Sequence, residues 1–136
     1  MDITRVAAII YAIVMLGAVA FEIALAAGAP WGAYAMGGES PGQLPPAMRI
    51  SAIIQAVLQA GMAAVILARA GLVLPGWSQV SHWLVWIVVA LTAFSLVLNL
   101  ITPSAGERAI WAPTISLLLI SSLIVAFSSL SATSAP

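Results

Sequence analysis

The sequence contains no cysteine and very little charge. Without cysteine there can be no disulfide framework, no cysteine-ligated zinc or iron–sulfur site and no thiol catalysis. Four basic and four acidic residues give a formal net charge of zero, so the chain has neither a basic stripe for nucleic acid nor a polybasic patch for anionic lipid. Nucleic acid is therefore excluded as a partner.

Residues and motifs that could bind a metal or a phosphate, or act in catalysis, are equally scarce. His82 is the single histidine, which makes neither a zinc site nor a bis-histidine haem site, although haem with another ligand stays open. The glycine pair Gly37 and Gly38 is not followed by the lysine of a phosphate loop, and no nucleophile has both a base and an orienting partner. We expect no enzyme activity, no metal and no cofactor.

What the chain has in abundance is apolar sequence. Hydrophobic residues make up 63% and charged residues 6% of the 136 positions, and the mean hydropathy is +1.17. Soluble domains contain about 45–50% apolar and about 25% charged residues. Such a composition predicts an integral membrane protein.

The apolar residues fall into about four runs, each long enough for a helix to cross a hydrocarbon core, which takes roughly 20 residues. We predict an all-α membrane protein of one domain, residues 1–136, with four transmembrane helices in a compact bundle. Pro113 would lie inside the fourth helix and kink it. The predicted spans are 6–27, 50–70, 83–101 and 109–130.

Turn and cap residues agree with these spans. Gly28 is placed to end the first helix, and Pro45 and Pro46 suit the start of the second. The motif "SAGE" before the fourth helix has the pattern of a capping box, in which Ser104 caps the helix and Glu107 reaches back to the serine backbone. We therefore interpret Glu107 as a cap.

Polar residues inside the spans predict a pocket. Glu22 lies about six residues before the end of the first helix, hence roughly 9 Å below the first-loop side at about 1.5 Å per residue. Gln55 and Asn99 fall at similar depth, Gln59 lies one turn deeper than Gln55, and Arg49 lies just above. We predict that Glu22, Gln55, Asn99 and Arg49 form a site for a ligand or a proton, since ionisable groups in membranes are functional candidates by default.

A structural interpretation of these residues stays open. Glu22 could be a neutral acid, or it could be neutralised in a network with Arg49, Gln55 or Asn99. The amides, Gln59 included, could serve only as hydrogen-bonding links between helices.

The loop between the first two spans is rich in glycine, proline and aromatic residues. It can be an ordinary interfacial loop anchored by Trp31 and Tyr34. It can also be a lid over the pocket of Glu22, buried by the protein at membrane depth.

Orientation is not determined by charge, because the arginines are divided equally between the two sides, Arg5 and Arg69 against Arg49 and Arg108. We favour cytoplasmic N- and C-termini in a bacterial cytoplasmic membrane, since the first helix usually dominates. An alternative is that the first helix is a cleaved signal peptide with a small-residue site at 24–26, but the run is longer than such segments usually are.

Two resemblances follow from these residues. The segment "AFEIAL" in a four-span chain resembles the first helix of the small multidrug resistance transporters, in which a first-helix glutamate has a role similar to that implied for Glu22. The chain as a whole resembles uncharacterised four-span membrane proteins of bacteria, through the blocks "GAPWGAYAMGG" and "TPSAGERAIWAP". The second resemblance implies a fold and no activity.

The favoured hypothesis is a multi-pass membrane protein without catalytic machinery that binds a small ligand or partner on the first-loop side. One alternative is a proton-coupled transporter subunit that uses Glu22. Another is an accessory subunit of a membrane complex, whose small-residue helix faces contact a second copy or another membrane protein.

Overall fold

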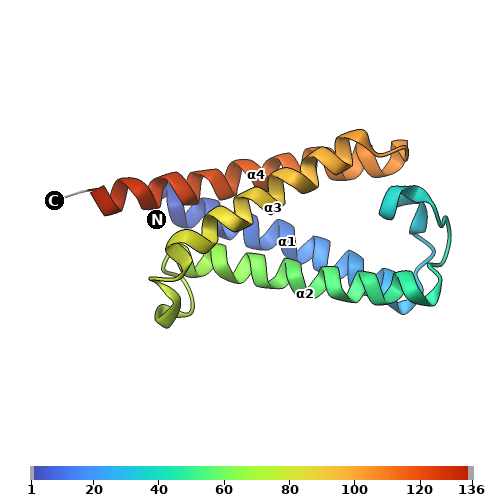
Figure 1. Cartoon of the computed structure of the whole chain (residues 1–136), viewed down its shortest axis with the longest axis horizontal. Helices are drawn as coiled ribbons and strands as arrows, with labels where there is room; N and C mark the ends of the chain where they lie inside the picture. Colours follow the sequence, from blue (N-terminus) through green and yellow to red (C-terminus); the bar gives the residue numbers. More distant parts are fainter. Residues whose placement is uncertain (1, 135–136) are drawn as a thin grey trace.

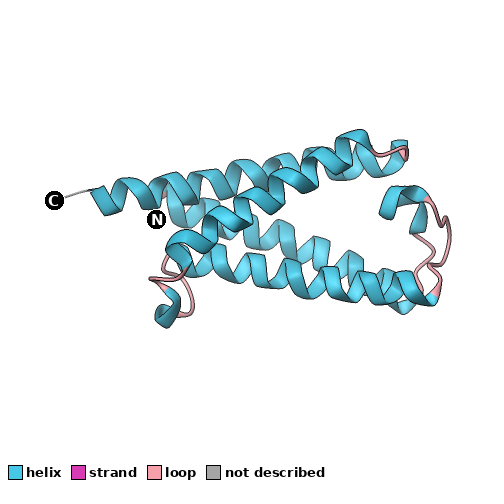
Figure 2. Cartoon of the chain, viewed as in Figure 1, coloured by secondary structure: helices cyan, strands magenta, loops and turns pink. Residues whose placement is uncertain are grey.

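The computed structural model describes the backbone of residues 2–134 and the side chains up to residue 128. All regular structure in this part of the chain is helical (Figure 2). Each of the four long helices is long and apolar enough to cross a membrane, so the predicted all-α, four-span fold is confirmed. The elements are α1 (Ile3–Ala27), η1 (Gly32–Tyr34), η2 (Met36–Gly38), α2 (Pro46–Arg69), η3 (Pro75–Trp77), α3 (Ser81–Ile101) and α4 (Ala105–Ser134).

The helices begin a few residues before the predicted spans because their first turns are formed by cap residues rather than by apolar ones. Asp2 caps α1 by accepting a hydrogen bond from the backbone N–H of Arg5 at 2.9 Å. Pro45 and Pro46 occupy the N-cap and first position of α2, as predicted. Gly28 ends α1 in the left-handed conformation, with a φ of 106°.

Pro113 stands in the interior of α4. Its ring nitrogen has no hydrogen to donate to the carbonyl of Ala109. The helix nevertheless continues through this position to Ser134, and the kink expected at the proline stays a prediction.

The four helices form two antiparallel pairs, α1 with α2 and α3 with α4, joined mainly by the packing of α1 on α4. By comparison, α2 and α3 contact each other little. Figure 1 shows these two helices close together near η3 and separated at the end where the first loop lies. The start of α1 and the end of α4 both lie at the η3 end. The bundle is therefore tight at one end and spread at the other.

The tight end contains the core. Tyr11, Ile66, Val85 and Val125, one from each long helix, are fully buried in a single cluster. The hydroxyl groups of Tyr11 and Thr92 lie 3.1 Å apart and link α1 to α3. This packing closes the middle of the bundle.

Most other polar groups bond within their own helix instead of linking helices. Asn99 donates from Nδ2 to the carbonyl of Ser95 at 2.8 Å, and Thr114 donates to the carbonyl of Ile110 at 2.7 Å. The interpretation of Asn99 as a link between helices is therefore wrong. Among the described residues, the hydrogen bond of Asn99 stays inside α3.

Candidate functional site

The first loop, residues 28–45, is a folded cap over one end of the bundle. Leu44 and Ala35 are buried and pack in one cluster with Leu25 of α1 and Ala52 of α2. The loop also closes on itself, since the N–H of Gly32 donates to the carbonyl of Gly42 at 2.9 Å. It is therefore more than a chain lying on the membrane surface.

Three hydrogen bonds attach this loop to the residues that begin α4. Each joins a backbone group of the loop to a side chain at or near the start of α4, so these side chains hold the loop in place. The bonds run from Gly37 N to Glu107 Oε2 at 2.8 Å, from Ser104 Oγ to Ala33 O at 2.7 Å, and from Trp111 Nε1 to Tyr34 O at 2.9 Å.

Only one of the two hydrogen bonds of the predicted capping box forms. Ser104 Oγ does accept from the N–H of Glu107 at 3.1 Å, as predicted. The return bond is absent from its expected place, because the carboxylate of Glu107 turns to Gly37 and the N–H of Ser104 donates to Thr102 Oγ1 at 3.3 Å. A part-buried N–H on the loop needs an acceptor, and Glu107 supplies it.

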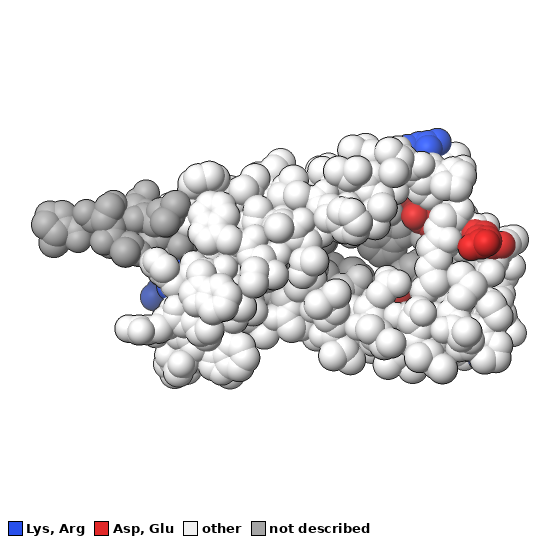
Figure 3. All heavy atoms as spheres, in the orientation of Figure 1, with Lys and Arg blue, Asp and Glu red and all other residues white. Residues whose placement is uncertain are grey.

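Beneath the loop lies a cavity of about 410 Å³ that all four long helices line. Figure 3 shows the molecule hollowed here, with acidic atoms, in red, beside the opening. Among the described residues, those that line the cavity include two acids and no lysine, arginine or histidine. The polar and aromatic lining residues are Glu22, Glu107, Gln55, Gln59, Asn99, Thr92, Ser95, Tyr34, Trp111, Phe21 and Phe94.

Both acids of this cavity are buried, Glu22 with 8% and Glu107 with 7% of the surface exposed. The side chain of Gln59 on α2 faces Glu22 at hydrogen-bonding range. Two oxygens of this pair, Glu22 Oε2 and Gln59 Oε1, are fully buried and have no hydrogen-bond partner. When Glu22 is ionised both are acceptors, and the site is then short of hydrogen-bond donors. Leaving a buried acceptor unpaired costs about 1–3 kcal/mol, and more for a charged group.

Arg49 does not join the site, contrary to its predicted place there. Its Nε donates to the carbonyl of Leu44 at 2.8 Å, and its Nη2 donates to Gln43 Oε1 at 3.4 Å. A Cβ atom on Gly28 would lie 3.6 Å from Nη2, so the guanidinium covers the C-terminus of α1. The partial negative charge of that helix end and the loop carbonyl hold Arg49 there, away from Glu22.

The two predicted loop residues take different positions. Tyr34 lines the cavity, and its ring lies so close to Gly106 that a Cβ there would be 2.7 Å from Tyr34 Cε1. Trp31 is not among the lining residues; it stacks on Phe21 with ring centroids 6.0 Å apart and remains 44% exposed. The loop therefore covers the cavity through Tyr34 and its neighbours, and Trp31 supports it from outside.

Of the predicted residues, Glu22, Gln55 and Asn99 line one cavity. The predicted site left out two others, since sequence reasoning favoured Gln59 as a link between helices over a ligand contact and interpreted Glu107 as a cap. Gln59 does link α2 to α1 through Glu22. A signal for Gln59 was present, because it lies four residues after Gln55 on the same helical face. No such signal existed for Glu107, whose place depends on the path of the loop.

Replacing Glu107 with alanine should loosen the loop, because the N–H of Gly37 then loses its charged acceptor. Hydrogen bonds to charged groups contribute about 1.5–3 kcal/mol, so amide hydrogen exchange of the loop should speed up by roughly tenfold or more. The matched control is Glu39→Ala, which removes an exposed acid from the same loop. Equal exchange in the two variants would show that the Glu107 bond does not hold the loop.

Within residues 2–134, no three His, Cys, Asp or Glu side chains lie close enough together to hold a metal ion. No protein-family model, curated protein or solved structure matches this chain. The case for a function therefore depends on the chemistry of the cavity itself.

Proposed function

We propose that this membrane protein binds a small amphipathic ligand in the cavity beneath the first loop, and that the ligand places a positively charged, hydrogen-bond-donating group against Glu22. The observation that carries this proposal is the pair of buried oxygens, Glu22 Oε2 and Gln59 Oε1, that have no partner. Buried acceptors of this kind are rarely left unpaired, and a donor from a ligand would satisfy both.

The charge of the cavity supports a cationic group over an anionic one. Glu22 and Glu107 both line it, and the lining includes no basic side chain of the described residues. The rings of Phe21 and Trp111 meet edge to face beside these acids, with centroids 4.8 Å apart. Aromatic faces attract ammonium groups, with a gain of about 2 kcal/mol where water is excluded.

The rest of the lining supports an apolar ligand body. Met15, Met62, Ile115 and Leu118 form the deeper wall. Methionine side chains adapt to ligands of different shape. A volume of about 410 Å³ lies within the usual range for small-molecule sites, which is about 300–1,000 Å³.

The proposal is tested with three probes that share one chain and differ in the head group: dodecylamine in its ammonium form, dodecanol and dodecanoate. Each is titrated into the protein in lipid nanodiscs, with empty nanodiscs subtracted. Dodecylammonium should bind saturably and about tenfold or more tighter than dodecanol, because charge-assisted hydrogen bonds are about twice as strong as neutral ones. Dodecanoate should not bind. Equal affinity for all three would overturn the proposal.

A second candidate, proton-coupled transport, is favoured by one observation. The carboxyl of Glu22 has an oxygen that no protein donor occupies, so a proton and a bound cation could alternate there. For the location, we propose a bacterial cytoplasmic membrane with both termini in the cytoplasm. In support, the start of α1 and the end of α4 lie at the same end of the bundle (Figure 1), and hence on the same side of a membrane.

A further inference from the structure

The cavity is closed at the end that faces water. The first loop lies across it, packed through Leu44 and Ala35 onto the ends of α1 and α2. The loop is also held to α4 by three hydrogen bonds, one of which ends on the carboxylate of Glu107. A ligand arriving from water would have to break these contacts together.

The opposite end of the cavity is closed as well. The linked hydroxyls of Tyr11 and Thr92 lie at its inner boundary, with Met15 and Leu118 buried beside them. Beyond them the core of the bundle fills the space between all four helices. No route passes through the tight end.

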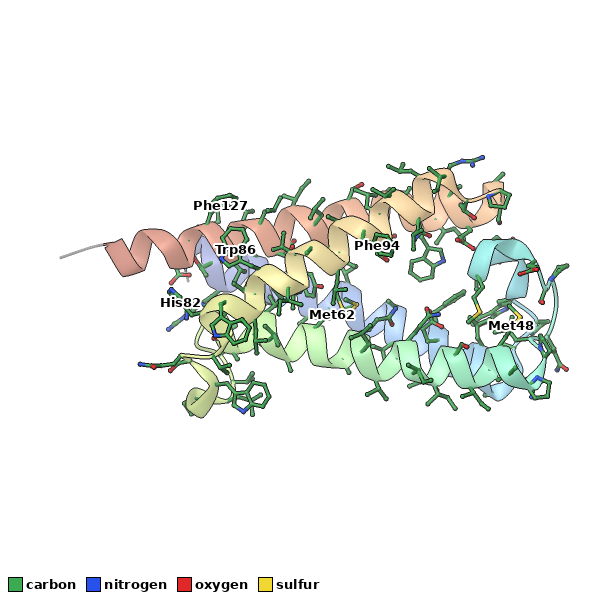
Figure 4. The ribbon with its side chains drawn as sticks, viewed as in Figure 1. Met48, Met62, His82, Trp86, Phe94 and Phe127 are labelled. Carbon is green, nitrogen blue, oxygen red and sulfur yellow. The ribbon has the colours of Figure 1, made fainter. Side chains whose placement is uncertain are left out.

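The side between α2 and α3 is different. Leu58 on α2 and Phe94 and Leu98 on α3 line the cavity and are also 51%, 62% and 47% exposed on the outer surface. These two helices contact each other little, and Figure 3 shows the hollow opening between them. In Figure 4, Met62 and Phe94 lie at the inner end of this opening. All of these side chains are apolar, so the opening faces the acyl chains of the lipid.

We infer that the ligand enters and leaves sideways from the membrane, between α2 and α3. This inference rests on the proposed function and specifies its ligand class: a single-chain cationic amphiphile already dissolved in the leaflet on the first-loop side. The head group reaches Glu22 and Gln59 inside the cavity. The part of the apolar chain next to the head group packs against the deeper wall of the cavity, and the rest passes between Leu58 and Leu98 into the lipid.

The energetic argument compares the two routes. Entry through the loop breaks hydrogen bonds and exposes buried apolar side chains to water, and each of these costs free energy. Entry between α2 and α3 exchanges lipid chains for a ligand chain beside Leu58 and Phe94, which are apolar and already exposed on the outer surface. The lateral route therefore has the lower barrier.

The chain has no cysteine, so a single thiol can report on access to the cavity. Met62→Cys places it on the buried wall, and Glu39→Cys places it on the exposed part of the loop. Each variant, in nanodiscs, is reacted with uncharged N-phenylmaleimide, which partitions into lipid, and with a quaternary-ammonium maleimide, whose charge keeps it out of lipid but suits the acidic cavity. Both reagents attack the same thiolate, so its abundance cancels from the ratio of their rates, and division by the ratio at Glu39→Cys removes the intrinsic reactivity of each reagent.

Lateral entry predicts that the ratio favours the uncharged reagent by about tenfold or more at Met62→Cys, relative to Glu39→Cys, since the charged reagent must first displace the loop. A large side chain at the opening, Leu98→Trp, should slow the uncharged reagent at Met62→Cys. Leu100→Trp is the matched control, two residues along α3, exposed and outside the cavity lining.

Two results would overturn the lateral route: equal access of both reagents to Met62→Cys, or an equal effect of the two tryptophan variants. Neither would affect the dodecylammonium titration, so this inference and the proposed function can fail separately. If Met62→Cys does not fold, Leu118→Cys on the opposite wall replaces it.

Discussion

Replacing Glu22 with glutamine should weaken the binding of dodecylammonium by at least about 30-fold, because removing one partner of a buried charge pair costs about 2–5 kcal/mol and 1.4 kcal/mol corresponds to tenfold. The substitution preserves the shape of the side chain, removes its charge and replaces one carboxylate oxygen with an amide NH2 group. The new amide also brings a donor to Gln59 Oε1, which is otherwise unpaired. We therefore expect the thermal stability to stay the same or to rise.

The measurement is the same nanodisc titration, with the thermal unfolding of each variant followed in parallel. Glu39→Gln is the matched control, because it makes the same chemical change at an exposed acid outside the cavity lining. It should leave the affinity unchanged. If Glu22→Gln binds the amine as well as the original protein does, Glu22 is not the counter-charge and the proposal is wrong.

The same variant distinguishes a binding protein from a transporter. A transporter predicts uptake of the amine into proteoliposomes that depends on the pH difference across the membrane and is lost in Glu22→Gln while the protein stays folded. A protein that only binds predicts saturable binding without uptake. An accessory subunit predicts instead a partner that co-purifies in mild detergent.

The depth of Glu22, Gln55 and Asn99 could be predicted because a helix rises by a fixed distance per residue. Once the loops mark the helix ends, every polar residue has a known leaflet. That reasoning brought three residues of one cavity together from three different helices. It depends only on local geometry, which the sequence determines well.

The partners of Arg49 and Glu107 could not be predicted in the same way. Each bonds to a backbone group of the first loop, Arg49 to the carbonyl of Leu44 and Glu107 to the N–H of Gly37. The path of a loop through left-handed residues such as Gly37 is not encoded by hydropathy or helical period. The sequence therefore placed both side chains at the correct end of the bundle and assigned them the wrong partners.

The opening between α2 and α3 could not be predicted from the sequence either. In a soluble protein, an apolar residue on a helix predicts a buried face. In a membrane, lipid-facing and core-facing residues are both apolar, so Leu58 and Ile66 of α2 look alike although one is half exposed and the other fully buried. Hydropathy could establish the number of helices but not which pair stands apart.

Replacing Gly32 with alanine should undock the first loop and destabilise the protein by about 3 kcal/mol or more, at the upper end of the cost of overpacking. A Cβ on Gly32 would lie 1.8 Å from the carbonyl oxygen of Ser40 and 2.8 Å from that of Gly42. Both are backbone atoms, so no side chain can turn aside to make room. When these carbonyl groups are pushed away, the hydrogen bond from Gly32 N to Gly42 O, which closes the loop, should be lost.

The Gly32→Ala variant also tests whether the first loop covers the cavity, which is a separate question from whether the loop stabilises the protein. In Gly32→Ala with Met62→Cys, the quaternary-ammonium maleimide should reach the cavity about tenfold faster or more, because the end facing water is then open. Gly76→Ala in the second loop is the matched control, since a Cβ there meets nothing within 4 Å. It should leave both the melting temperature and the labelling ratio unchanged. If Gly32→Ala behaves like this control, the first loop does not close the cavity, and the charged reagent must be excluded by another part of the bundle.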